Sequence, residues 1–141
     1  MARQIQFTQT GGPEVLELVD VEPRAPGPGE IRIANRAVGL NFIDIYVRSG
    51  LYPSQPPSGL GTEGAGVVDA VGDGVEDFAE GDRVAYAQGP LGAYAEFITM
   101  DADKAIALPE GINFDTAAAG MLKGLTVQYL LRQTYAIGEG D

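Results

Sequence analysis

The fold is decided by a glycine-rich stretch in the middle of the chain, Gly59-Leu60-Gly61-Thr62-Glu63-Gly64-Ala65-Gly66-Val67-Val68-Asp69-Ala70-Val71. Its first six residues match the G-x-G-x-x-G pattern of dinucleotide-binding folds, which requires a strand before the glycines and a helix after them. Here a proline-rich loop precedes the glycines (residues 52–57), and a β-branched, glycine-studded run follows them. We therefore interpret the stretch as a turn into a strand, in which Gly61, Gly64 and Gly66 permit close backbone packing, and not as a phosphate cradle.

Short apolar runs continue this β pattern on both sides of the stretch. Clusters rich in glycine and proline separate the runs, which is typical of an all-β barrel or sandwich. The predicted strands are residues 4–7, 15–21, 30–38, 65–71, 83–87, 94–99 and 104–108. Because a flat sheet of this many strands would leave long edges exposed, we predict a partly open β-barrel.

Two segments depart from the β pattern and predict helices. Residues 41–49 have a capping residue at the start, Asn41, and a glycine after the end, Gly50, which favours a short helix. Residues 114–135 are rich in Ala, Leu, Met and Gln and predict helix in two pieces, broken near Lys123-Gly124. The predicted fold class is mostly β with short helices.

The helical composition after residue 112 also suggests a division of the chain. We predict a β domain over residues 1–112 and a helical segment over residues 113–141. The chain closes on Gly138-Glu139-Gly140-Asp141, interpreted as a polar turn after which the protein continues.

Composition excludes several classes of function. The 141 residues, 45% of them hydrophobic, suit one soluble globular domain. The chain has no cysteine and no histidine, so disulfides are excluded and the nitrogen and sulfur ligands that zinc prefers are missing. A net charge of −11 disfavours nucleic acid and anionic membranes as partners. With no long apolar run and no apolar leader, we expect a cytoplasmic protein.

The acidic residues are densest between residues 63 and 82, where they alternate with glycine and valine. A cation site is one interpretation of this density. We favour solvated turns between strands, because the spacing matches no calcium-binding loop.

Four ordered patterns carry a resemblance to a known family. They are Asn41-Phe42-Ile43-Asp44 running on to Arg48-Ser49-Gly50-Leu51-Tyr52-Pro53, the stretch Gly61-Thr62-Glu63-Gly64-Ala65-Gly66-Val67-Val68, Gly81-Asp82-Arg83-Val84, and Gly92-Ala93-Tyr94-Ala95-Glu96. With them the chain resembles the amino-terminal, GroES-like catalytic domain of the medium-chain dehydrogenase/reductase superfamily, and within it the zinc-independent quinone oxidoreductases. Zinc-dependent members place a cysteine near Asn41 and a histidine where Thr62 stands, and neither residue here can replace them at zinc.

The resemblance implies a function for a longer protein. Its GroES-like barrel would be followed, after Asp141, by a Rossmann domain that is missing here. The whole would be an NADPH-dependent quinone reductase, with NADH as the alternative cofactor, that transfers hydride to a quinone without metal. A homodimer is expected, and the 141 residues alone are expected to be inactive. Two alternatives remain open: an enone or other double-bond reductase on the same scaffold, and a non-enzymatic GroES-like interaction module.

The resemblance also implies candidate site residues. Tyr46 and Tyr52 would line the active-site cleft and hydrogen-bond a quinone oxygen, and Asn41 would face the nicotinamide end of the cofactor. No metal ligand is implied. The predicted cofactor contacts are Asn41, Phe42, Asp44, Tyr46, Lys123, Thr126 and Tyr129.

Each candidate also has a purely structural interpretation. Asn41 could serve only as the helix cap, and the two tyrosines could be half-buried aromatics with wet hydroxyls. Asp44 could face solvent or pair with Arg48. Lys123 could be a solvated helix end. For Glu63, a structural ion pair is the first interpretation and a role in the active site the second.

Overall fold

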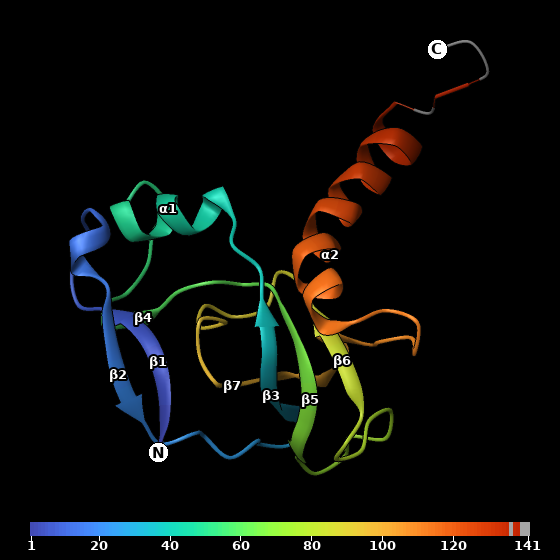
Figure 1. Cartoon of the computed structure of the whole chain (residues 1–141), viewed down its shortest axis with the longest axis horizontal. Helices are drawn as coiled ribbons and strands as arrows, with labels where there is room; N and C mark the ends of the chain where they lie inside the picture. Colours follow the sequence, from blue (N-terminus) through green and yellow to red (C-terminus); the bar gives the residue numbers. More distant parts are fainter. Residues whose placement is uncertain (136, 139–141) are drawn as a thin grey trace.

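The computed structural model describes residues 1–135 and 137–138, and within them it forms a β structure from which one long helix projects (Figure 1). The helices are α1 (Phe42–Ser49) and α2 (Phe114–Tyr129). The strands are β1 (Ala2–Phe7), β2 (Glu17–Val21), β3 (Glu30–Val38), β4 (Ser58–Gly59), β5 (Gly64–Val71), β6 (Arg83–Tyr86), β7 (Phe97–Asp101) and β8 (Ala105–Ala107).

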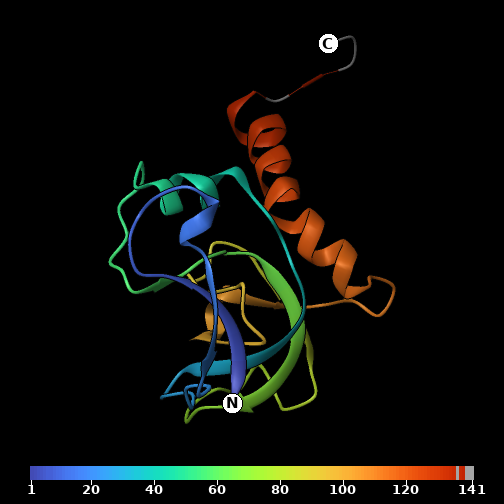
Figure 2. The same ribbon diagram turned by 60° about the vertical axis from the view of Figure 1, so that its left-hand side comes forward.

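The strands form two antiparallel sheets that curve around a shared interior. One sheet has the order β2-β1-β4 and the other the order β7-β3-β5-β6-β8. The pairing of β3 with β5 shifts register twice, between Arg32 and Ile33 and between Asn35 and Ala37. Such irregularities bend a sheet, and Figure 2 shows β3 and β5 curling across the molecule. The predicted mostly-β, partly open barrel is confirmed.

The core lies inside the five-stranded sheet. Ile31 and Ile33 alternate along β3 with more exposed neighbours and are fully buried, as expected of a strand with one face on a core. Tyr86 is also buried, and its hydroxyl donates to Asn35 Oδ1 at 2.9 Å. The remaining buried members of this cluster are Val68, Val84, Ala93, Ile98, Met100 and Ala105.

The predicted strands are confirmed in place, and some of their ends differ. Strand β3 has the predicted bounds, whereas β2 begins two residues late because Pro13–Val15 forms a 3-10 turn. Strand β7 begins at Phe97 because the chain before it makes isolated backbone hydrogen bonds to β1. Strand β4, of two residues, was not predicted; it is too short to leave an apolar pattern.

The glycine-rich stretch behaves as predicted. After β4 the backbone turns at Gly61, whose φ is +87°, and enters β5 with no helix. At Gly66 a Cβ atom would overlap the carbonyl oxygen of Ala34 on β3. The glycines therefore serve close strand packing, and the phosphate-cradle interpretation is excluded for this stretch.

Helix α1 is confirmed as predicted, with Asn41 as its N-cap and Gly50 as its left-handed C-cap. The predicted break near Lys123-Gly124 is wrong, because α2 runs unbroken through both residues and continues as a π-helical segment, Leu130–Thr134. A helix-interior glycine costs only about 1 kcal/mol relative to alanine. The cap at Asn113, which accepts from the Thr116 N–H at 2.7 Å, and packing on the sheet maintain the helix.

Two further observations concern the carboxyl-terminal residues and the length of the helices. Of the predicted terminal turn, residues 139–141 lie outside the described residues. Within the described part of the chain, no helix is both long and apolar enough to cross a membrane.

The turn before β3 gives a prediction about pH. Glu30 accepts two hydrogen bonds from the Arg24 guanidinium, at 2.6 and 2.7 Å, and one from the Gly27 N–H at 2.8 Å. These contacts, the one from Arg24 foremost, lower the pKa of Glu30 from 4.5 to about 2. A depressed carboxyl pKa stabilises the fold above the unfolded-state value, and this contribution is lost as pH falls towards the folded-state value.

We therefore expect the Glu30→Gln variant to lose less stability than the unaltered protein when the pH falls from 4.5 to about 2. The measurement is the urea midpoint at neutral pH and across that window. The same change at the exposed Glu76 is the control. An unchanged acid profile in Glu30→Gln would show that the contacts of this turn contribute nothing to acid stability.

Candidate functional site

Three polar side chains meet where α1 begins, where β5 begins and where α2 passes over the sheet. Asn41 Nδ2 donates to Glu63 Oε2 at 2.8 Å. Lys123 Nζ donates to Asn41 Oδ1 at 2.8 Å and to Glu63 Oε2 at 3.0 Å. The fold thus brings together two of the predicted cofactor contacts, Asn41 and Lys123, around Glu63.

Glu63 is the buried centre of this polar cluster. Its side chain is 0% exposed, and its second oxygen, Oε1, accepts from the Leu122 N–H of α2 at 2.6 Å. The Lys123 side chain is 50% exposed, so the ion pair joins a buried carboxylate to a half-exposed ammonium. The ion pair predicted for Glu63 is present, with Lys123 as its partner. The interpretation of Lys123 as a solvated helix end is wrong, since α2 continues past it.

Asp44 is not on the surface. It is 2% exposed, and its Oδ2 accepts from the Asn41 N–H at 2.9 Å and from the Tyr94 hydroxyl at 2.7 Å. The solvent-facing alternative is therefore wrong. The alternative pairing with Arg48 is wrong too, because the Arg48 guanidinium donates to the Gly11 carbonyl oxygen at 3.3 Å and both hydrogen bonds to the Asp44 carboxylate come from other groups.

Tyr94 is a residue of this region that sequence reasoning missed as a partner of Asp44. Burial, reinforced by the Asp44 carboxylate, raises the pKa of Tyr94 well above its usual value. The phenol therefore stays protonated and donates to Asp44. No local pattern could identify the pair, because 50 residues separate its members.

The aromatic candidates lie on the outer side of α1. The rings of Tyr46 and Tyr52 pack edge to face with centroids 5.5 Å apart, and the Tyr52 N–H donates to the Tyr46 carbonyl oxygen at 3.0 Å. Both tyrosines are partly exposed, and Phe42 is 76% exposed. The structure therefore brings the two tyrosines together as neighbours on an exposed surface.

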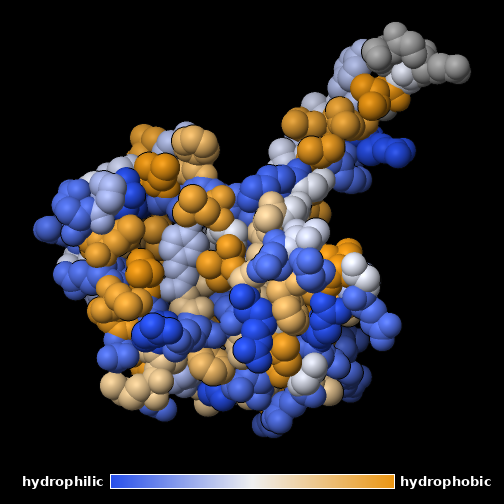
Figure 3. All heavy atoms as spheres, viewed as in Figure 1, coloured by the Kyte–Doolittle hydropathy of each residue, from blue (hydrophilic) through white to orange (hydrophobic). Residues whose placement is uncertain are grey.

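The last two candidates follow Lys123 on the projecting part of α2. The Thr126 hydroxyl donates to the Leu122 carbonyl oxygen at 3.0 Å within the helix, and Tyr129 is exposed. Figure 3 shows apolar side chains gathered over α1 and along the projecting half of α2. The exposed apolar residues of this half are Leu125, Val127, Tyr129, Leu130 and Leu131.

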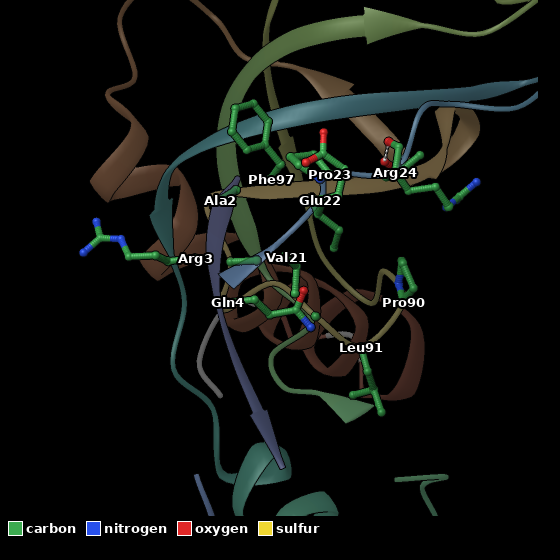
Figure 4. A pocket seen from close by; sticks show the side chains of 14 residues that line it. Ala2, Arg3, Gln4, Val21, Glu22, Pro23, Arg24, Pro90, Leu91 and Phe97 are labelled. Carbon is green, nitrogen blue, oxygen red and sulfur yellow. Dashed lines mark hydrogen bonds between the residues drawn. The ribbon is translucent and has the colours of Figure 1, made fainter. Parts of the chain in front are cut away.

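Two cavities of the barrel lie away from the candidate residues. One of about 220 Å³ opens beside β1, between the end of β2 and the loop before β7, and Figure 4 shows Arg3, Gln4, Glu22 and Arg24 among its lining side chains. A more apolar hollow of about 440 Å³ lies between β8 and the start of α2, lined by residues such as Ile106, Leu108 and Met121. Neither is lined by a predicted site residue, so the candidates form an open face and not one of these cavities.

The described residues were also compared with the requirements of a metal site. Within residues 1–135 and 137–138, no group of three or more His, Cys, Asp or Glu side chains could hold a metal ion.

A curled half-barrel with one capping helix and a second helix leaving it is the architecture of a GroES-like domain. Residues 27–110 match the family described as "Alcohol dehydrogenase GroES-like domain", and the chain belongs to this family.

Several relatives of the chain are named as oxidoreductases or reductases. The chain is 62% identical to the quinone oxidoreductase of Pseudomonas aeruginosa, covering 100% of this chain and 44% of that protein. It superimposes with a TM-score of 0.95 on the Escherichia coli quinone oxidoreductase solved with NADPH, at 56% identity over 96% of this chain and 42% of that one. It is 43% identical to the 2-haloacrylate reductase of a Burkholderia species, over 93% of this chain and 41% of that protein. The chain thus spans less than half the length of the curated relatives it matches.

Proposed function

We propose that this chain is the substrate-side domain of an NADPH-dependent quinone reductase, with NADH as the alternative cofactor. The observation that carries the proposal is the 56% identity, over 96% of the chain, to a quinone oxidoreductase solved with NADPH. In this proposal residues 1–112 form the catalytic barrel, residues 113–141 lead towards a cofactor-binding Rossmann domain, and the chain alone is inactive. The whole protein would be a cytoplasmic homodimer with no nucleic-acid or membrane partner, in keeping with its net charge of −11.

The residues present fit a nicotinamide cofactor. Lys123 uses two of its three N–H donors within the polar cluster and is half exposed, so one donor remains for a ligand. Asn41 likewise keeps one amide N–H. In the proposal these two groups hold the nicotinamide end, while Thr126 and Tyr129 meet the nucleotide further along α2. Phe42 completes the contacts through its exposed ring, and the buried Asp44 contributes by fixing the start of α1.

Bound NADPH supplies hydride to the quinone. The task of this chain is then to orient the quinone and to stabilise the negative charge that develops on its oxygen. In the proposal Tyr46 and Tyr52 do this through their hydroxyls; their partly exposed rings pack edge to face, one on α1 and one just after it. The hydride and one proton together yield the hydroquinone. We propose that no zinc takes part, because the chain has neither histidine nor cysteine and a quinone needs little Lewis-acid assistance.

A double-bond reductase is the second candidate function. The 43% identity to a 2-haloacrylate reductase favours it, since that protein is named for an activated alkene and not for a quinone. Both acceptors take hydride at an electron-poor carbon or ring. One open, metal-free face can therefore serve either reaction.

The test uses the full-length protein that contains this chain. Oxidation of NADPH is followed with a simple benzoquinone and, separately, with 2-chloroacrylate, before and after treatment with a strong chelator. We expect turnover with the quinone that survives the chelator. Turnover with the acrylate alone would replace the quinone reductase with the double-bond reductase, and failure to bind either NADPH or NADH would favour the interaction module.

A further inference from the structure

We propose that Glu63 is a positioning residue, which holds the Asn41 amide and the Lys123 ammonium so that each keeps one N–H donor for a ligand oxygen. The proposal rests on the proposed function and names the chemistry of its cofactor face. The predicted ligand atom is an uncharged carbonyl oxygen, on the cofactor's carboxamide or on the quinone.

The orientation of Asn41 follows from its two partners. A carboxylate only accepts hydrogen bonds, so the amide nitrogen of Asn41 must face Glu63, as it does at 2.8 Å. An ammonium only donates, so the amide oxygen must face Lys123, as it does at 2.8 Å. A rotated amide would place donor against donor and acceptor against acceptor. Glu63 and Lys123 together therefore permit one orientation.

Every oxygen of the cluster accepts at least one hydrogen bond from within it. The Asn41 oxygen accepts from Lys123, and the two Glu63 oxygens accept from Asn41, Lys123 and the Leu122 N–H. What remains towards the exposed side is one amide N–H of Asn41 and one N–H of Lys123. A ligand group with an oxygen acceptor fits such a pair of donors.

Glu63 is itself held firmly enough to direct its neighbours. It is fully buried, its Oε1 is fixed by the backbone of α2, and its carbonyl oxygen accepts from the Gly39 N–H at 3.0 Å. Asn41 is the N-cap residue of α1, and Lys123 lies on α2. Glu63 directly precedes β5. The carboxylate therefore ties the start of α1 to α2.

The first test is Glu63→Gln in the full-length protein. The Leu122 N–H requires an acceptor and so takes the oxygen of the introduced amide, whose nitrogen is then left facing Lys123 and Asn41. Asn41 must rotate or lose its partner. We expect the Kd for NADPH, or the KM for the quinone at saturating NADPH, to rise about tenfold, the loss of one hydrogen bond involving a charged group. A rise in Kd assigns the donors to the cofactor oxygen, and a rise in KM alone assigns them to the quinone oxygen.

The double variant Glu63→Gln with Asn41→Asp separates positioning from stability. The carboxylate introduced at position 41 accepts both from the amide introduced at position 63 and from Lys123. The internal hydrogen bonds are thereby restored, while the free amide donor of Asn41 is lost. We expect the unfolding midpoint to recover towards that of the unaltered protein while ligand affinity stays low. This variant also decides the matter if Glu63→Gln alone does not fold.

Asp69→Asn is the matched control. Asp69 is another carboxylate in an ion pair, on β5 with Arg32 at 2.6 Å, and it lies away from the cluster. We expect this variant to keep both constants. Unchanged Kd and KM in folded Glu63→Gln, or full affinity in the double variant, would overturn the proposal. Lack of any NADPH-dependent turnover in the unaltered protein would instead overturn the proposed function.

Discussion

Replacing Gly39 with alanine is expected to lower the free energy of unfolding by about 3 kcal/mol, as overpacking of a filled interior does. Gly39 follows β3 and lies beneath α2. A Cβ atom there would overlap both Glu63 Oε2 and the backbone carbonyl oxygen of Ala118. The carbonyl belongs to a helix and cannot rotate away, so α2 must shift from the sheet. Because α2 carries Lys123, the same shift should weaken NADPH binding.

The measurement is urea unfolding of the chain together with NADPH binding by the full-length protein. Gly120→Ala is the control, since a Cβ atom at Gly120 would meet nothing within 4 Å. That change places alanine in a helix interior and should be neutral or stabilising by up to about 1 kcal/mol. Equal stability of the two variants would mean that the contact between Gly39 and α2 is not close in solution.

Tyr46→Phe and Tyr52→Phe are each expected to lower kcat with a quinone about 100-fold in the full-length protein. The physical reason is the loss of a hydrogen bond that strengthens as charge develops on the quinone oxygen, for which single donors account for factors of about 10² to 10³. KM for NADPH should change little, because the phenols are proposed to face the quinone. Steady-state rates at saturating NADPH measure this directly.

Stability separates this proposal from a structural role of the tyrosines. Both side chains are partly exposed, and phenylalanine keeps the edge-to-face packing of the two rings. The thermal midpoint should therefore stay within a degree or so of the unaltered protein, as for other surface substitutions. If both variants turn over quinone at the original rate, the tyrosines are surface aromatics and the developing charge is stabilised by other groups.

Local signals predicted much of the fold. The bounds of α1 follow from local contacts: at the start Asp44 accepts from the Asn41 N–H, and at the end the left-handed Gly50 donates to the Val47 carbonyl oxygen. The bounds of β3 follow from its alternating apolar residues. The predicted break in α2 was wrong because tertiary packing outweighs a local preference. The free-energy cost of a glycine at position 124 is small, whereas Ala117 and Ala118 pack the helix against Ala65 and Ala85 of the sheet. The division at residue 112 and the roles of the site residues stay predictions.

The candidate site was only partly accessible to sequence reasoning. Asn41, Asp44 and Lys123 were each identified through the family resemblance, and their environments were not. The two structural interpretations of Asp44, a solvent-facing position and a pairing with Arg48, were wrong, because it lies buried against Tyr94. A one-dimensional pattern reports periodicity and caps, and it does not report which distant groups share a low-dielectric interior.

By itself, therefore, the sequence determined the β character, the helix caps, the strand-entering turn at the glycines and the lack of the usual zinc ligands, because each depends on residue type and on neighbours along the chain. Only the tertiary structure decided that Glu63 joins Asn41, 22 residues away, to Lys123, 60 residues away. Burial makes that carboxylate require partners, and the curling of the sheet under α2 provides them.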